Sequence, residues 1–120
     1  MKVLIIDDSP TEAHVIKGYL SRHDMEVLVA HDAEEGIKVA KEQQPDAILM
    51  DVVMPGMNGF QATRFLTKDP QTSSIPIIIL TTKGAETDRV WGMRQGAMDY
   101  LVKPVEENDL IGRLNSLLAR

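Results

Sequence analysis

The sequence has no cysteine among its 120 residues, and it lacks both a long hydrophobic run and an excess of basic residues. Without cysteine it cannot form a disulfide, a thiolate metal site or a thiol nucleophile. The apolar stretch Val3–Ile6 after the N-terminus is too short for a signal-peptide core or a membrane span, so we expect a cytoplasmic protein without membrane insertion. The net charge of −5 argues against nucleic acid as a partner, because proteins that bind nucleic acid present a basic surface.

The composition that is present is that of an ordinary folded domain. The chain is 43% hydrophobic and 26% charged, with no low-complexity segment and no block of like charges. A chain of this length has room for one core, and no stretch has the composition of a linker. We therefore expect residues 1–120 to form a single domain, and we expect that domain to be a monomer.

Short apolar runs alternate with amphipathic stretches along the whole chain. The runs predict strands at residues 3–6, 27–30, 47–50, 77–80 and 98–102. The amphipathic stretches predict helices whose apolar faces contain Val15, Ile16, Tyr19 and Leu20; Ala33, Ile37 and Ala40; Ala62, Phe65 and Leu66; Val90 and Met93; and Leu110, Leu114, Leu117 and Leu118. Strands that alternate with helices in this way predict an α/β fold, a doubly wound parallel sheet with helices on both faces.

The segment from Pro45 to Gly56 places a carboxylate, Asp51, at the end of a buried strand. Four apolar residues precede this aspartate, which is typical of a strand covered on both faces, although a short buried helix has the same pattern. Pro55 followed by Gly56 is typical of a type II turn, so the chain must reverse just past Asp51. Asp51 is therefore expected at the rim of the sheet.

Polar residues also follow three other predicted strands, and carboxyl ends of parallel strands meet at one edge of a sheet. They are Asp7 and Asp8 after the first strand, Thr81 and Thr82 after the fourth, and Lys103 after the fifth. Single residues of this set, and Asp51 itself, have simpler explanations when taken alone. Asp51 could start a turn, Thr81 could cap a helix and Lys103 could be a solvated surface residue. Those explanations do not account for their convergence.

The segment after Asp8 has the pattern of a helix start. Ser9 is a suitable N-cap, Pro10 suits the first helical position, and Glu12 is placed to close a capping box. The helix dipole favours acids near a helix N-terminus, which is one explanation of Asp7 and Asp8. Capping does not require two successive carboxylates before the cap, so the pair is also a candidate for another role.

Carboxylates gathered at one edge need a cation. Two of them about 5 Å apart repel by roughly 3 kcal/mol at an effective dielectric constant of 20. The donors are oxygens, and His14, His23 and His31 are not spaced as a metal-binding pair, so the pattern favours a hard ion and Mg²⁺ over Ca²⁺. A bound Mg²⁺ can neutralise phosphoryl oxygens, which makes Asp51 a candidate phosphoryl acceptor.

This set of residues, Asp7–Asp8, Asp51 with Met54–Gly56, Thr81 and Lys103–Pro104, resembles the CheY-like receiver domain of two-component response regulators. The resemblance covers the whole chain and implies a five-stranded sheet of order 2-1-3-4-5 with no output domain. It further implies that Asp51 accepts a phosphoryl group from the phosphohistidine of a CheA-like kinase. Asp8 and Asp51 would bind Mg²⁺ directly, Asp7 through water, and Val53 through its backbone carbonyl.

The resemblance also implies roles for residues around the phosphoryl group. Lys103, Thr81, Thr82 and the backbone of Val52 would bind its oxygens, and the bond from Lys103 to Pro104 would be cis. Thr81 would move toward the phosphoryl group and Tyr100 would follow inward as the switch residue, with an ordinary strand-edge aromatic as the alternative. The face that binds the unknown output protein would contain Arg89, Trp91, Arg94 and Tyr100, although Trp91 could equally be a packing residue.

Stretches such as 7–12, 58–64 and 81–83 further resemble the single-domain regulators of type IV pilus twitching motility. The resemblance implies a signalling protein and not an enzyme acting on an outside substrate, and leaves open a phosphate sink without an output partner. A flavodoxin-like cofactor-binding module shares the fold, but it needs a phosphate-cradling loop where this chain has Asp7 and Asp8. An aspartate-nucleophile phosphatase generally has a second acid where this chain has Val53.

Overall fold

The computed structural model describes residues 1–119 and contains every strand that the sequence predicts, with bounds that differ by no more than one residue. The strands are β1 (Lys2–Ile6), β2 (Glu26–Ala30), β3 (Ala47–Met50), β4 (Ile77–Thr81) and β5 (Asp99–Val102). The helices are α1 (Pro10–Ser21), α2 (Ala33–Gln43), α3 (Gly59–Lys68), α4 (Glu86–Arg94) and α5 (Glu107–Leu118). Among the described residues, no helix is both long and apolar enough to cross a membrane.

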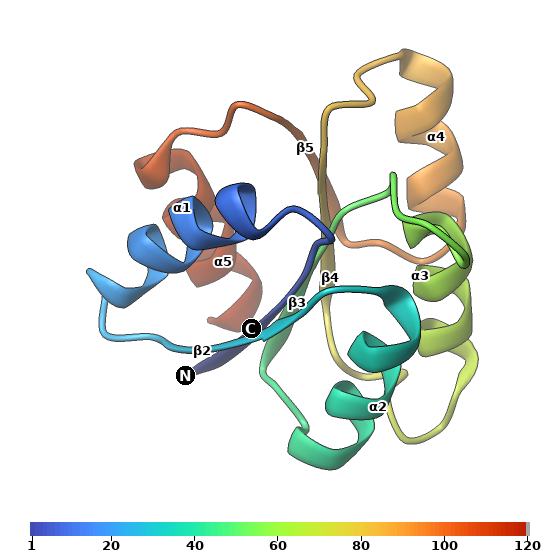
Figure 1. Cartoon of the computed structure of the whole chain (residues 1–120), viewed down its shortest axis with the longest axis horizontal. Coiled ribbons are helices and arrows are strands. Elements are labelled where there is room, and N and C mark those ends of the chain that lie inside the picture. Colours follow the sequence, from blue (N-terminus) through green and yellow to red (C-terminus); the bar gives the residue numbers. More distant parts are fainter. Residues whose placement is uncertain (120) are drawn as a thin grey trace.

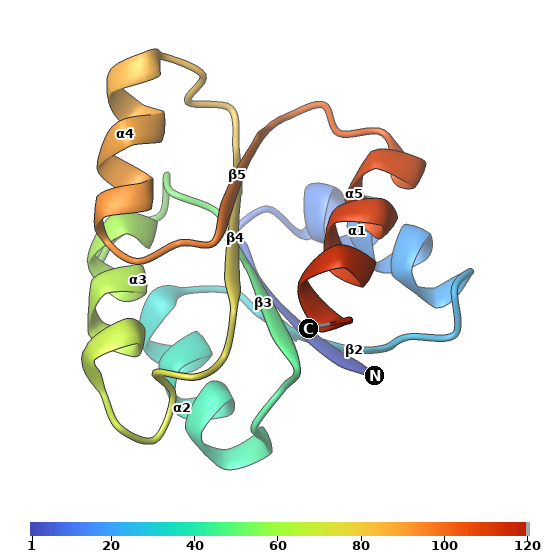
Figure 2. The same ribbon diagram turned by 180° about the vertical axis from the view of Figure 1, so that it is seen from behind.

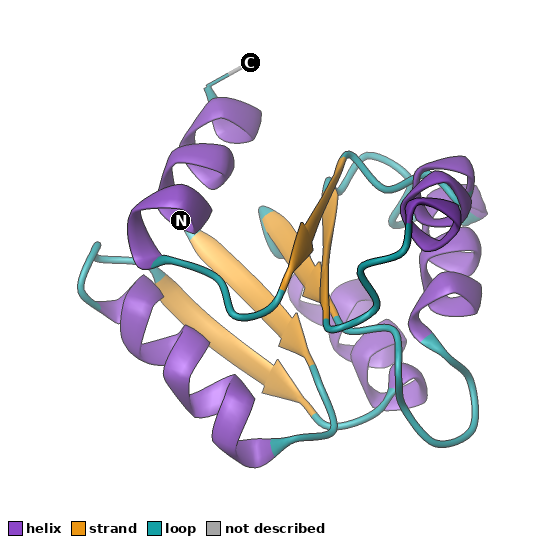
Figure 3. Cartoon of the chain, turned by 90° about the horizontal axis from the view of Figure 1, so that it is seen from above, coloured by secondary structure: helices purple, strands orange, loops and turns teal. Residues whose placement is uncertain are grey.

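The strands form one parallel sheet of order β2-β1-β3-β4-β5, which confirms the predicted fold class. The sheet lies between two helical layers, with α1 and α5 on one face and α2, α3 and α4 on the other (Figures 1 and 2). The strands run in the same general direction, so their carboxyl ends gather at one edge (Figure 3). Strand order reverses between β1 and β3, where ligands bind in folds of this kind.

Two apolar cores fill the space on the two faces of the sheet. Successive residues of a strand point to opposite faces, so Leu4 and Ile6 join the core under α2 and α3, while Val3 and Ile5 join the core under α1 and α5. All four residues of β3 are buried. This double coverage explains why the strand appears in the sequence as a continuous apolar run.

The start of α1 differs from the prediction. Ser9 is the N-cap and accepts a hydrogen bond from the backbone N–H of Glu12 at 3.3 Å. The N–H of Ser9, however, donates to Oδ1 of Asp7 at 2.9 Å, and the carboxylate of Glu12 pairs with Lys103 at 3.2 Å. The predicted capping box is therefore wrong, because the Ser9 N–H and the Glu12 carboxylate, which would have bonded to each other, are bound to Asp7 and Lys103.

Several apolar residues predicted on the inner faces of helices are exposed. Val15 is 46% exposed, because Ala13, Ile16 and Leu20 form the buried stripe of α1. Phe65 is 43% exposed, and the ammonium of Lys41 lies 5.2 Å from the centre of its ring.

Helix α4 turns a glycine and not its large apolar residues toward the sheet. Gly92 is its one buried residue, and a Cβ atom there would lie 2.9 Å from side-chain atoms of Ile79 and Tyr100. Val90, Trp91 and Met93 remain on the outer surface, so the packing interpretation of Trp91, at 50% exposure, is wrong.

Candidate functional site: an acidic cluster facing a lysine

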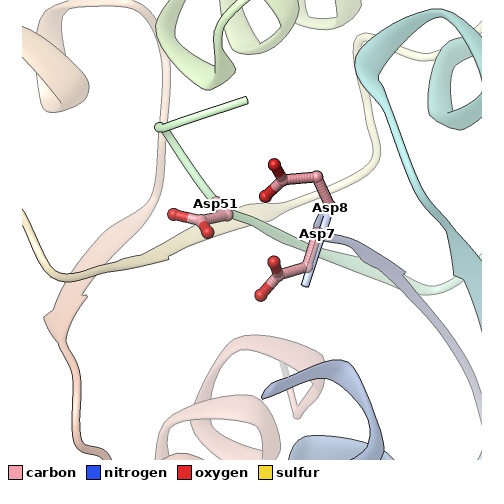
Figure 4. A group of neighbouring side chains, drawn as sticks. All are labelled: Asp7, Asp8 and Asp51. Carbon is pink, nitrogen blue, oxygen red and sulfur yellow. The ribbon is translucent and has the colours of Figure 1, made fainter. Parts of the chain in front are cut away.

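Three carboxylates meet at the carboxyl ends of β1 and β3. Ile6 pairs with Met50 across these neighbouring strands, and the N–H of Asp51 donates to the carbonyl of Ile6 at 3.0 Å. Asp7, Asp8 and Asp51 consequently leave the sheet at the same edge, and one carboxylate oxygen of each lies within 4.8 Å of the others (Figure 4). The predicted convergence of these acids is thus present in the structure.

Lys103 faces this cluster from the end of β5. Its backbone N–H donates to the carbonyl of Thr81 at 2.8 Å, which holds the residue beside the end of β4. Its Nζ lies 2.7 Å from Oδ2 of Asp7 and 3.4 Å from Oδ2 of Asp51, and its bond to Pro104 is cis, as the resemblance implies. Burial alone would lower the pKa of Lys103, but the hydrogen bond to Asp7 and the charges of Asp51 and Asp7 outweigh it, so the pKa is raised.

Asp51 begins the loop between β3 and α3, and backbone hydrogen bonds hold this loop in place. Asp51 is 8% exposed, and its Oδ1 accepts a hydrogen bond from the N–H of Val52 at 2.7 Å. The N–H of Gly59, the first residue of α3, donates to the carbonyl of Val52 at 2.9 Å. Gly56 has a φ of 74°, which is the backbone that the predicted turn requires. Val53 is 57% exposed and points away from the core.

Thr81 ends β4, the strand between β3 and β5, while Thr82 follows it and Tyr100 lies within β5. Thr81 is fully buried, with its Oγ1 accepting a hydrogen bond from the N–H of Lys83 at 3.4 Å, while Thr82 is exposed. Tyr100 is 2% exposed, and its hydroxyl donates to the carbonyl of Lys83 at 2.6 Å. Burial, and then the negative charges of Asp88 and Asp51, raise the pKa of Tyr100 to about 12. The tyrosine therefore lies inward, hydrogen-bonded to the loop that follows β4.

The residues of the predicted partner face divide into two groups. Arg89, Trp91 and Arg94 are exposed along α4. Tyr100 is not on that surface, although the Arg89 guanidinium donates to its backbone carbonyl at 3.4 Å.

The acidic cluster fits a divalent cation. Its donors are carboxylate oxygens, the type that Mg²⁺ prefers, and it is the one group of three or more potential ligand residues found in the described part of the chain. The three histidines are exposed and lie outside it.

Sequence reasoning missed two residues that touch the site. Glu12 reaches Lys103 across the sheet edge, and no local pattern indicates that contact. Gly59 lies so close to the backbone of Asp51 that a Cβ atom would not fit. A glycine directly after the helix cap Asn58 is the one signal that could have pointed to it.

The response regulator receiver domain model matches residues 3–115, and the chain belongs to this family. It is 55% identical over 118 residues to Protein PilH of Pseudomonas aeruginosa, an alignment that covers 98% of each protein. It is 36% identical to Response regulator PleD of Caulobacter vibrioides, of which it spans 26%.

Solved structures agree with the family and the fold. The chemotaxis protein CheY4 of Vibrio cholerae superposes with a TM-score of 0.91 at 32% identity, with 98% of each chain covered. The BeF3-activated receiver domain of Klebsiella pneumoniae RstA superposes with a TM-score of 0.93 at 28% identity over both whole chains. The sequence-based recognition of a CheY-like response regulator, close to PilH, is confirmed.

Proposed function

We propose that this protein is a single-domain response regulator whose Asp51 accepts a phosphoryl group from the phosphohistidine of a CheA-like kinase. The observation that carries the proposal is the position of Asp51, buried at the sheet edge beside two further carboxylates and the ammonium of Lys103. A carboxylate in this position is a nucleophile with a cation beside it for the charge of the group it accepts.

In the proposed transfer, a carboxylate oxygen of Asp51 forms a bond to phosphorus. The bond from phosphorus to the histidine nitrogen breaks, and its electron pair stays on the imidazole. Lys103, the N–H of Val52 and the hydroxyls of Thr81 and Thr82 are the groups proposed to bind the phosphoryl oxygens. Hydrolysis of the aspartyl phosphate by water would return the protein to its starting state.

Asp8 and Asp51, with Asp7 through water and the carbonyl of Val53, are the residues proposed to hold Mg²⁺. When bound, the ion would neutralise charge on the phosphoryl oxygens during transfer. The proposed Mg²⁺ site is supported by the three carboxylates, which have oxygens within 4.8 Å of one another.

The proposed output runs from Asp51 through Thr81 to the surface of α4. Phosphorylation adds negative charge and acceptor oxygens, which would draw Thr81 toward Asp51. Tyr100 is anchored on Lys83, two residues after Thr81, so a shift of this loop would reach Tyr100 and the exposed residues Arg89, Trp91 and Arg94. An output protein that binds this surface would detect the change.

The pathway we propose is type IV pilus twitching motility, with the protein acting in the cytoplasm. The support is the identity of 55% with Protein PilH over nearly the full length of both proteins. The alternative role is a phosphate sink, which would drain phosphoryl groups from a sister regulator. Such a protein uses the same phosphoryl chemistry but needs no output partner.

The test is to incubate the purified protein with acetyl phosphate and Mg²⁺ and to measure its intact mass. Wild type should gain one phosphoryl group, and Asp51→Asn should gain none. Addition to both proteins would overturn the assignment of Asp51, and addition to neither would overturn the phosphoacceptor function.

A further inference from the structure

Lys103 contacts a third carboxylate that belongs neither to the acidic cluster nor to the end of a strand. Oε1 of Glu12, on the first turn of α1, lies 3.2 Å from Nζ of Lys103. The lysine side chain is 9% exposed, and its two other acidic partners, Asp7 and Asp51, are 5% and 9% exposed at their side chains. Glu12 is different, because its side chain is 44% exposed.

Helix capping does not explain the position of Glu12. Its backbone N–H is held by the Ser9 side chain, but its carboxylate makes no bond to the N-cap, whose N–H already donates to Asp7. Metal binding does not explain it either, since the acidic cluster comprises Asp7, Asp8 and Asp51 without it. The one polar partner of the Glu12 carboxylate among the described residues is Lys103.

We propose that Glu12 is a positioning residue that acts through Lys103 and holds the ammonium back from the phosphoryl group. The inference rests on the proposed function, because it concerns the lysine that would bind the oxygens of phosphorylated Asp51. In the unphosphorylated protein, Glu12 competes for that ammonium. Phosphoryl transfer then requires Lys103 to exchange a bond to Glu12 for one to the phosphoryl group.

The direction of the effect follows from the charges. A neutral residue in place of Glu12 removes the competitor for Lys103 and one of the negative charges that repel an incoming phosphodonor. Both changes favour the charged transition state of phosphoryl transfer. The pair is partly exposed to solvent, so the effect should be modest, an increase of about threefold in the rate of phosphorylation.

The experiment measures the rate of phosphorylation by acetyl phosphate and Mg²⁺ in wild type and three variants. Glu12→Gln removes the charge with little change of shape. Glu12→Asp keeps the charge but withdraws it from Lys103 by one methylene. Glu42→Gln, at an exposed position of α2, is the matched control for loss of a surface glutamate. Thermal unfolding of each variant shows whether α1 is intact, which a capping role would alter.

The expected result is a faster reaction for Glu12→Gln and Glu12→Asp, with Glu42→Gln equal to wild type and all melting temperatures unchanged. Equal rates for wild type and Glu12→Gln would overturn the inference and leave the phosphoacceptor function standing. A wild-type rate for Glu12→Asp beside a faster Glu12→Gln would also overturn it, because charge alone would then explain the effect. A wild type that gains no phosphoryl group would overturn the proposed function and this inference together.

Discussion

Gly59 lies against the backbone of Asp51 with no room for a side chain. A Cβ atom at Gly59 would be 2.8 Å from the carbonyl carbon of Asp51 and closer still to the carbonyl oxygen. The start of α3 is therefore in direct contact with the segment that carries the proposed phosphoacceptor. The N–H of Gly59 also donates a hydrogen bond to the carbonyl of Val52 in that segment.

We predict that Gly59→Ala destabilises the fold by about 1–3 kcal/mol, the usual cost of forcing an extra methyl group into a closely packed site. It should also slow phosphorylation, because the loop that carries Asp51 must move. Urea unfolding and the acetyl phosphate assay measure the two effects.

Gly112→Ala in α5 is the control, since a Cβ atom there meets nothing within 4 Å. It should be neutral or stabilise the helix by up to about 1 kcal/mol. Equal stability of the two alanine variants would contradict the close approach at Gly59.

The hydroxyl of Tyr100 should make stability depend on pH at the alkaline end. Its pKa is raised to about 12 in the folded protein from 10.0, so above pH 10 the unfolded chain releases the proton more readily than the folded one. The contribution of this group is fully present below pH 10 and is lost as the pH rises toward 12.

The comparison is between wild type and Tyr100→Phe in thermal unfolding from neutral to alkaline pH. At neutral pH the variant should be less stable by about 1 kcal/mol, because it loses the hydrogen bond to the carbonyl of Lys83. That difference should shrink above pH 10. A constant difference across the range would show that Tyr100 titrates normally.

The acidic cluster should lower stability when no metal is bound. Without Mg²⁺, Asp8→Asn removes one of three neighbouring negative charges and should stabilise the protein by about 1 kcal/mol, a small value because Asp8 is exposed. With saturating Mg²⁺ the order should reverse, since wild type gains about 2.7 kcal/mol at a concentration 100 times the Kd.

Thermal unfolding in EDTA and in excess Mg²⁺ tests this reversal. Glu42→Gln, at an exposed position of α2 outside the cluster, controls for the loss of a surface charge. Equal stabilisation of wild type and Asp8→Asn by Mg²⁺ would exclude Asp8 as a ligand.

The sequence predicted the features that depend on local pattern and on the geometry of parallel sheets. Strand β3 was recognisable because breakers bound its apolar run, and Asp7, Asp51 and Lys103 could be brought together because the carboxyl ends of parallel strands converge.

The features that could not be predicted depend on which of several possible contacts a side chain makes in the folded protein. Glu12 has the spacing of a capping box, but a lysine from the distant end of β5 takes its carboxylate. Phe65 has the spacing of a core residue, but Ala62 and Leu66 fill the buried stripe of α3, and Phe65 lies outside beneath Lys41. Spacing shows which residues share a face of a helix, but it does not show how wide the buried part of that face is.

The measurement that tests the account most directly is to locate the phosphoryl group within the chain. Protein treated with acetyl phosphate and Mg²⁺ is reduced with borohydride, which converts an aspartyl phosphate to homoserine, and its peptides are sequenced by mass spectrometry. We predict homoserine at position 51 and aspartate at positions 7 and 8. Homoserine at position 7 or 8, with aspartate retained at position 51, would contradict the account.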